Sequence, residues 1–281
     1  MIEKAIHITK PENLKYYNQR YSRIYFGNEF CQNLIPSLKQ IKEAIIFARR
    51  NKAGFTLLTP FVTELGLSKL SLVFQFLKKN ESAAEIIVND WGVLELLATK
   101  YRNIFELSLG RLLTRQQRDP SLQRVIMKQQ TAGIKDRNGR IKILVHVPPG
   151  EKYHSGIQSS YINSISLQRF LYALGIRRVE LNNIIQGLLV DNIIFEKTIY
   201  TPFINISTTR FCPMLTPKQK KYRISFCRRE CQKVYSKLRN RYVPKIIYKQ
   251  GNTTFYKNPV ALKKITLLGI GRVVYQPQLP F

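Results

Sequence analysis

Short apolar runs alternate along the chain with segments whose apolar residues recur every three or four positions. EIIVND at 85–90 is typical of a strand buried in a sheet, whereas LIPSLKQIKEAIIFARR at 34–50 has the spacing of an amphipathic helix. The predicted strands span 23–27, 54–60, 85–90, 104–111, 178–182 and 201–208. The predicted helices span 34–50, 68–79, 91–101 and 166–174.

This alternation indicates parallel strands joined by crossover helices. At 281 residues we expect an α/β fold of the (β/α) or TIM-barrel type, regular or irregular, with an open doubly wound sheet as the alternative. A polar stretch at 114–160 interrupts the alternation, although IKILVHV at 141–147 has the composition of a strand. We expect residues 1–281 to form a single barrel domain, with a basic, cysteine-containing C-terminal segment at 211–249.

A barrel of this type places functional side chains just beyond the C-terminal ends of its strands. The residues at those positions are Asn28, Glu29, Thr59, Asn89, Asp90, Gly110, Arg111, Asn182, Asn183, Thr208, Thr209 and Arg210. Guanidinium groups bind carboxylates and phosphates through paired hydrogen bonds, so Arg111, Arg115 and Arg118 are candidates for such a clamp. A helix surface with ordinary ion pairs explains the same three arginines. The residues that we expect to bind substrate are Asn89, Asp90, Arg111, Arg115 and Arg210.

The chain has four cysteines, and three of them fall in one segment with the spacing C-x14-C-x3-C. Those three are Cys212, Cys227 and Cys231, and the fourth, Cys31, lies far upstream. Cys31 follows the first predicted strand and Cys212 follows a late one. Because the first and last strands of a closed barrel are neighbours, we expect the four thiols to meet. Four thiolates suit a structural zinc or a cubane iron–sulfur cluster, and two small buried core residues are the simpler explanation of the C-x3-C pair.

The net charge of +29 comes from 46 basic and only 17 acidic residues. A field this positive attracts polyanions, of which nucleic acid is the most common, although compositional drift also raises the lysine content. The segment 218–249 holds twelve Lys or Arg residues and one acid, Glu230. These cations either stabilise a negatively charged cluster, guide RNA phosphates, or form a solvated basic face with no ligand.

The N-terminal segment MIEKAIHITKPENLKYY is polar and is broken by Pro11, so we expect no signal peptide. No apolar run is long enough to predict a membrane span. These features indicate a cytoplasmic protein, in which thiols stay reduced and clustered cysteines are typical of metal ligands.

Four segments together resemble peptidase family U32. They are VNDWGVLELL, SLGRLLTRQQRDP, RVELNNIIQG and STTRFCP, the last followed by C-x14-C-x3-C. The resemblance extends from about Tyr25 to Cys231. It is strongest to the short, single-domain members, including the pair of proteins that hydroxylate ubiquinone precursors without oxygen.

The resemblance implies a barrel-like fold and a 4Fe-4S cluster bound by Cys31, Cys212, Cys227 and Cys231, with zinc as the alternative metal. It further implies an oxygen-independent hydroxylase, or a subunit of one, that acts on a quinone precursor or an RNA base. The resemblance also implies a small anionic oxygen donor, such as prephenate, and a second U32 protein as heterodimer partner.

Two other functions stand beside this one. An RNA-binding or partner subunit with a structural cluster would explain the basic segment, with tRNA or rRNA as its ligand. A collagenase-like, metal-dependent peptidase is suggested only by the family name, since the sequence has no HExxH motif and no Ser–His–Asp order.

Overall fold

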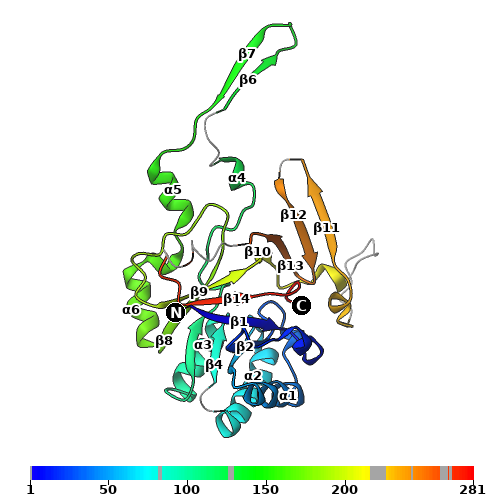
Figure 1. Ribbon diagram of the computed structural model, residues 1–281, viewed down its shortest axis with the longest axis vertical. Coiled ribbons are helices and arrows are strands. Elements are labelled where there is room, and N and C mark those ends of the chain that lie inside the picture. Colours follow the sequence, from blue (N-terminus) through cyan, green and yellow to red (C-terminus); the bar gives the residue numbers. More distant parts are fainter. Residues whose placement is uncertain are drawn as a thin grey trace.

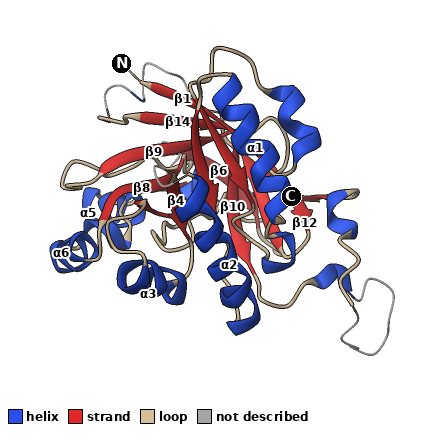
Figure 2. Cartoon of the chain, turned by 90° about the horizontal axis from the view of Figure 1, so that it is seen from below, coloured by secondary structure: helices blue, strands red, loops and turns tan. Residues whose placement is uncertain are grey.

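Eight parallel strands of the described chain close into a barrel, and helices lie around its outside (Figures 1 and 2). This computed structural model describes residues 2–81, 84–125, 130–215, 226–241, 243–259, 265 and 268–281. The order around the barrel is β1, β14, β9, β8, β5, β4, β3 and β2, and β2 pairs with β1 to complete the ring. The strands span Glu3–Ile8 (β1), Arg23–Gly27 (β2), Gly54–Leu58 (β3), Glu85–Val88 (β4), Glu106–Leu109 (β5), Ile176–Asn182 (β8), Glu196–Thr201 (β9) and Arg272–Tyr275 (β14). The expected α/β barrel is confirmed.

Five of the predicted strands are barrel strands, namely β2, β3, β4, β5 and β8. The apolar pattern missed the other three, which are β1, β9 and β14. Each of these begins with a charged residue, Glu3, Glu196 or Arg272, and is short of apolar alternation at that end. The first predicted strand, 23–27, is therefore the second strand of the barrel.

The helices that cover the barrel carry one apolar face each and are bounded by polar caps. They are α1 (Leu38–Arg50), α2 (Glu64–Asn80), α3 (Trp91–Lys100) and α6 (Ile165–Ala173). Helix α1 begins after Pro36 because Ser37 and Gln40 form a capping box, in which each side chain bonds the other's backbone N–H. Its buried side chains are Ile41, Ala44, Ile45 and Ala48. The spacing of these four residues is the helical period that the sequence shows.

A second, antiparallel sheet follows β9, in the order β10–β13–β12–β11. Its strands span Phe203–Thr208 (β10), Ser236–Asn240 (β11), Val243–Gln250 (β12) and Thr253–Lys257 (β13). The strand predicted at 201–208 is thus β10 and lies outside the barrel, because Pro202 separates it from β9 and has no N–H to donate to the barrel's hydrogen bonds. Phe203 and Phe255 of this sheet pack with Phe30 and Phe281 in an apolar cluster of their own.

The polar stretch at 114–160 forms a projecting arm (Figure 1). It contains α4 (Leu122–Val125), the hairpin of β6 (Gln130–Lys135) and β7 (Ile141–His146), and α5 (Glu151–Gln158). The strand predicted at 141–147 exists, but it pairs only with β6 in a two-stranded sheet. Short 3-10 turns complete the described chain: η1 (Pro11–Tyr16), η2 (Gln32–Leu34), η3 (Tyr161–Asn163), η4 (Pro213–Leu215) and η5 (Glu230–Gln232).

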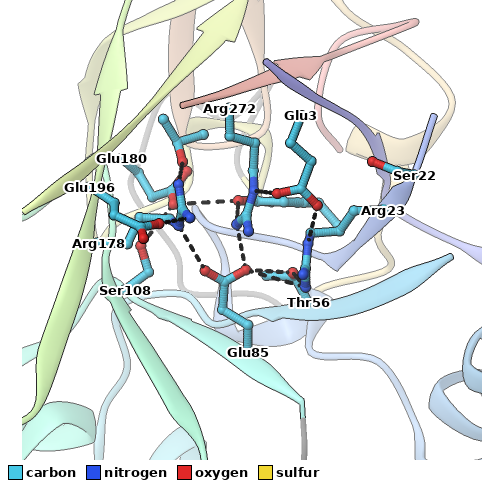
Figure 3. A network of polar contacts seen from close by, with 12 residues as sticks. Glu3, Ser22, Arg23, Thr56, Glu85, Ser108, Arg178, Glu180, Glu196 and Arg272 are labelled. Carbon is cyan, nitrogen blue, oxygen red and sulfur yellow. Dashed lines mark hydrogen bonds and ion pairs between the residues drawn. The ribbon is translucent and has the colours of Figure 1, made fainter. Parts of the chain in front are cut away.

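Charged side chains fill the amino-terminal end of the barrel (Figure 3). Arg272 binds Glu3 and Glu85, with nitrogen–oxygen distances of 2.6 Å in both pairs. Glu85 also lies 3.3 Å from the Nε of Arg178 and 3.6 Å from Arg23. Glu3, Arg23, Glu85, Glu196 and Arg272 are each the first residue of a barrel strand. Ion pairs therefore close this end of the barrel.

No helix within the described residues combines the length and the apolar character that a membrane crossing requires.

Candidate metal centre

The four cysteines gather beside the second sheet, near the C-terminal end of the barrel. Cys212, Cys227 and Cys231 line one pocket of about 380 Å³. Cys31 packs against the apolar cluster that contains Cys231. The thiols are close enough that Cys31, Cys212 and Cys227 all influence the pKa of Cys231. The structure therefore brings together all four residues that the sequence predicts as ligands.

The route by which they meet differs from the predicted one. Cys31 follows β2, and Cys212 follows β10, which is outside the barrel. Between β2 and β9 the barrel has two further strands, β1 and β14, so closure alone does not bring these segments together.

The turn between β12 and β13 makes the connection. The side-chain amide of Asn252 donates to the carbonyl oxygen of Phe30 and to that of Thr209, both at 2.7 Å. Gln250 donates to the carbonyl oxygen of Cys231, also at 2.7 Å. Phe30 immediately precedes Cys31, and Thr209 lies three residues before Cys212. Two amide side chains, one at the end of β12 and one in the turn that follows it, thus hold three segments that are far apart in the sequence.

Cys31 and Cys212 have the same local surroundings. Each directly precedes a single 3-10 turn, η2 or η4. The backbone N–H groups of Asn33 and Leu34 donate to the sulfur of Cys31, and those of Met214 and Leu215 donate to the sulfur of Cys212. Asn28 fixes the first segment by accepting the N–H groups of Phe30 and Cys31, both at 2.9 Å. Hydrogen bonds of this kind stabilise a thiolate and tune the potential of a cluster bound to it.

Burial and the nearby thiols raise the pKa of Cys31, Cys212 and Cys231 and favour their protonated form. Burial, the largest cause, together with the three neighbouring thiols raises the pKa of Cys231 to about 12. Burial also raises the pKa of Cys31 and of Cys212, against the lowering effect of their N–H donors. A bound cation that pairs with the sulfurs would reverse this preference, because the thiolate is the form that binds metal.

Four sulfur donors are the ligand set of both structural zinc sites and cubane iron–sulfur clusters. Within the described residues, no group of three or more His, Cys, Asp or Glu side chains is arranged as ligands of one metal ion. A tetrahedral zinc site needs sulfurs about 2.3 Å from one centre. In a cubane each thiolate binds a different iron, so the four sulfurs stand farther apart. Three of the thiols line one pocket, and Cys31 packs against the apolar cluster that contains Cys231. The sulfurs of Cys31 and Cys212 each accept backbone N–H groups.

Arg111 is the largest fully buried side chain, with no exposed surface. Its guanidinium forms an ion pair with Glu29 and donates to Asn182 at 3.1 Å and to the carbonyl oxygen of Phe203 at 3.2 Å. It also lies 3.8 Å from the centre of the Tyr200 ring. Arg111 therefore ties the ends of β2, β5 and β8 to the start of β10, and its hydrogen-bonding groups already have partners.

Asn89 and Asp90 likewise hold the barrel mouth. Asn89 donates to the carbonyl oxygen of Thr59 at 2.9 Å and accepts the N–H of Leu112 at 3.0 Å. Asp90 caps α3 by accepting the N–H groups of Gly92 and Val93. As ligands of a substrate, both residues stay predictions.

The other arginines differ in exposure and in contacts. Arg115 and Arg210 are exposed and lie over the rings of Tyr161 and Phe61, at 5.4 and 5.8 Å. Arg118 is the opposite case, since its Nε and Nη1 are buried and have no hydrogen-bond partner among the described residues. Burial lowers the pKa of Arg118 to about 10, and nearby Arg111 lowers it further. A buried guanidinium without a counter-ion is costly, so Arg118 is the arginine best suited to meet an anion.

Comparison with known proteins finds matches only among solved structures, at very low sequence identity. Neither the protein-family models nor the curated proteins contain a match to this chain. Among solved structures, the U32 peptidase Mk0906 is 9% identical and aligns over 99% of this chain and 94% of its own, with a TM-score of 0.48. An immunomodulatory active chitinase from Trichuris suis, TsES1, is 9% identical over 98% of this chain and 91% of its own, with a TM-score of 0.36.

Sequence reasoning missed the residues that assemble the site. Asn252 and Gln250 belong to a polar turn, and nothing in their spacing relates them to Cys31 or Cys231. Glu29 was visible as a polar residue after a strand, but its pairing with Arg111 depends on an approach between β2 and β5 that spacing does not show. The sequence does show that acids are scarce, so few carboxylates could be the partner of a buried arginine such as Arg111.

Proposed function

We propose that this chain is an iron–sulfur protein of the U32 type, in which Cys31, Cys212, Cys227 and Cys231 bind one 4Fe-4S cluster. The observation that carries the proposal is the meeting of distant cysteine segments at the β12–β13 turn. Fixed hydrogen bonds on both sides of the site support a preformed pocket. The U32-like motifs of the sequence support the same metal.

The residues around the thiols suit a negatively charged centre. When bound, a cluster of this kind supplies one-electron transfer at a potential set by its surroundings. The N–H groups that point at Cys31 and Cys212 would share the negative charge of the sulfurs. Arg228 and Arg229 line the same pocket and would stabilise an added electron, which raises the potential.

We further propose oxygen-independent hydroxylation as the reaction, with a quinone precursor or an RNA base as substrate. The family resemblance motivates this step, and it brings a small anionic oxygen donor such as prephenate and a second U32 protein as partner. The Nε and Nη1 of Arg118 are buried and have no partner in the described chain, so this residue is our candidate for holding the donor's carboxylate.

Anaerobic purification tests the metal assignment. We expect a brown protein with the broad visible absorbance of thiolate-to-iron charge transfer. Replacing Cys227→Ser should bleach it, whereas Met214→Leu, in the same pocket, should leave the spectrum unchanged. A colourless protein that contains zinc and no sulfide would contradict the proposal.

A structural cluster in an RNA-binding subunit is the second candidate function. The observation that favours it is the β11–β12 hairpin, where five Lys or Arg residues occur within 236–250 and no acid does. Deleting the gene and mapping modified nucleotides and quinone intermediates separates the two functions. Loss of a hydroxylated product supports catalysis, whereas RNA binding without any such loss supports the structural role. Cleavage of denatured collagen by the holoprotein would instead support a peptidase.

A further inference from the structure

A second pocket is lined by Gln232 and Lys233, the two residues that follow Cys231 in the chain. It has a volume of about 350 Å³ and forms between the second sheet, the segment after η5 and the C-terminal segment. We call this site the aromatic pocket and define it by six of its lining residues. They are Phe203, Lys233, Tyr235, Tyr248, Gln250 and Lys257.

Aromatic rings form one wall of this pocket. Tyr248 meets Phe203 edge to face, with ring centres 6.1 Å apart, and lies 6.1 Å from the ring of Tyr235. Tyr235 is 49% exposed, so a face of this wall is open to solvent. Open aromatic rings in a cavity are the common platform for stacking a flat unsaturated ring.

The pocket is also positively charged. The Nζ of Lys257 lies 5.0 Å from the centre of the Phe203 ring and 5.7 Å from that of Tyr248, and Lys233 is at the rim. All acidic residues of the chain lie in its described part, and none of them lines this pocket. A ligand that carries negative charge therefore complements it.

Gln250 adds a specific requirement. Its side chain is 94% buried, and its amide nitrogen is fixed by the bond to the carbonyl oxygen of Cys231. Its Oε1 is buried and has no partner among the described residues. A buried acceptor without a donor destabilises the fold, and a ligand with an N–H or O–H group would satisfy it.

The charge continues beyond the pocket along one hairpin. Tyr235 immediately precedes β11, Tyr248 is within β12, and Lys237 pairs directly opposite Tyr248. In Figure 1 this hairpin projects away from the barrel. An isolated aromatic acid needs one or two cations, whereas a polynucleotide presents a phosphate at every nucleotide and needs a row of them. The basic hairpin therefore favours a nucleotide within a strand over a small aromatic acid.

We propose that the aromatic pocket binds an unstacked base of a single-stranded nucleic acid, while the β11–β12 hairpin binds the neighbouring phosphates. The base stacks on Tyr248 and donates a hydrogen bond to Gln250. Because Gln250 also contacts the Cys231 backbone, this inference rests on the proposed function and names the substrate class that would reach the metal centre.

The test is fluorescence anisotropy with the full chain, reconstituted anaerobically, and labelled single-stranded RNA. We expect Tyr248→Ala to weaken binding about 5- to 150-fold, since stacking one base contributes on the order of 1–3 kcal/mol. Tyr248→Phe keeps the ring and should restore most of the affinity. Tyr172→Ala, an exposed ring on α6, is the matched control and should bind like the wild type. Lys237→Gln should reduce the slope of log K against log salt by about one.

Three results would overturn the inference. They are equal binding by wild type and Tyr248→Ala, equal affinity for duplex and single strand, and tighter binding of a free aromatic carboxylate than of an oligonucleotide. Single-stranded DNA of the same sequence shows whether the sugar matters. Iron and sulfide are measured on the same samples, so a protein that binds RNA through Tyr248 but carries no cluster refutes the proposed function and leaves this inference standing.

Discussion

At the scale of single residues, Glu180 is the buried group whose charge state depends most directly on the fold. Its Oε1 accepts the hydroxyl of Ser108 at 2.7 Å, and its Oε2 is buried with no partner among the described residues. Burial raises the pKa of Glu180 to about 7, and the charge of Glu85 raises it further. The native state thus retains a proton on Glu180 that the unfolded chain has lost by pH 6.

This predicts a pH dependence of stability with a defined sign. The unfolded carboxyl titrates near pH 4.5, so the stabilisation is fully present below that pH and is lost as the pH rises through about 7. Glu180→Gln imitates the protonated form. Relative to wild type, the variant should gain roughly 1–3 kcal/mol in unfolding free energy between pH 5 and pH 8.

Urea unfolding monitored by Trp91, the only tryptophan, measures this difference. Burial lowers the pKa of His7 to about 4, which acts with the opposite sign, but His7 is present in both proteins and cancels. Parallel stability curves for the two proteins across this range would show that Glu180 is ionised in the native state.

Asn252 is the single side chain on which the metal centre depends most. Asn252→Ala removes the two hydrogen bonds that join the Cys31 and Cys212 segments and leaves two carbonyl oxygens without their donor. We expect a loss of about 1–3 kcal/mol in stability and a lower iron content per chain. Asn138→Ala, in the β6–β7 turn, is the control and should change neither quantity. Full iron retention by Asn252→Ala would mean that the cysteine segments meet without this clamp.

At the scale of elements, the apolar pattern predicted the strands that are apolar throughout and missed those that begin with charge. Strands β3 and β4 are buried over most of their length and read as continuous apolar runs. Strands β1, β9 and β14 begin with Glu3, Glu196 and Arg272, whose burial in pairs is invisible in a hydropathy pattern. The order of strands around a ring is likewise absent from local periodicity.

The ion pairs at the start of the missed strands lead to a prediction about stability. Arg272 is 3% exposed and compensates both Glu3 and Glu85. Arg272→Met should cost roughly 3–5 kcal/mol, because it removes the closest cation of the buried Glu85 and one of the two that pair with Glu3. Arg49→Gln breaks a surface pair with Glu81 and should cost less than about 1 kcal/mol. Thermal and urea unfolding compare the two, and equal losses would show that the barrel end is not held by these ion pairs.

At the scale of the whole molecule, the cysteine count and the family-like motifs located the candidate metal centre, while the fold explains its assembly. The expectation that closure of the first strand against the last would join the cysteine segments is wrong. Cys31 follows β2, the second strand of the barrel, and Cys212 follows β10 of the second sheet. The aromatic pocket could not be predicted, because its walls come from β10, β12 and the C-terminal segment, which are adjacent only in the folded chain.

The central claim is that Cys31 shares one cluster with cysteines about 180 residues away in the sequence. Iron and acid-labile sulfide per chain, with a ⁵⁷Fe Mössbauer spectrum, test it most directly. We predict about four of each in the wild type and a similar loss in Cys31→Ser and Cys227→Ser. A Cys31→Ser protein that keeps the full iron and sulfide content, or a wild type that holds metal without sulfide, would contradict the account.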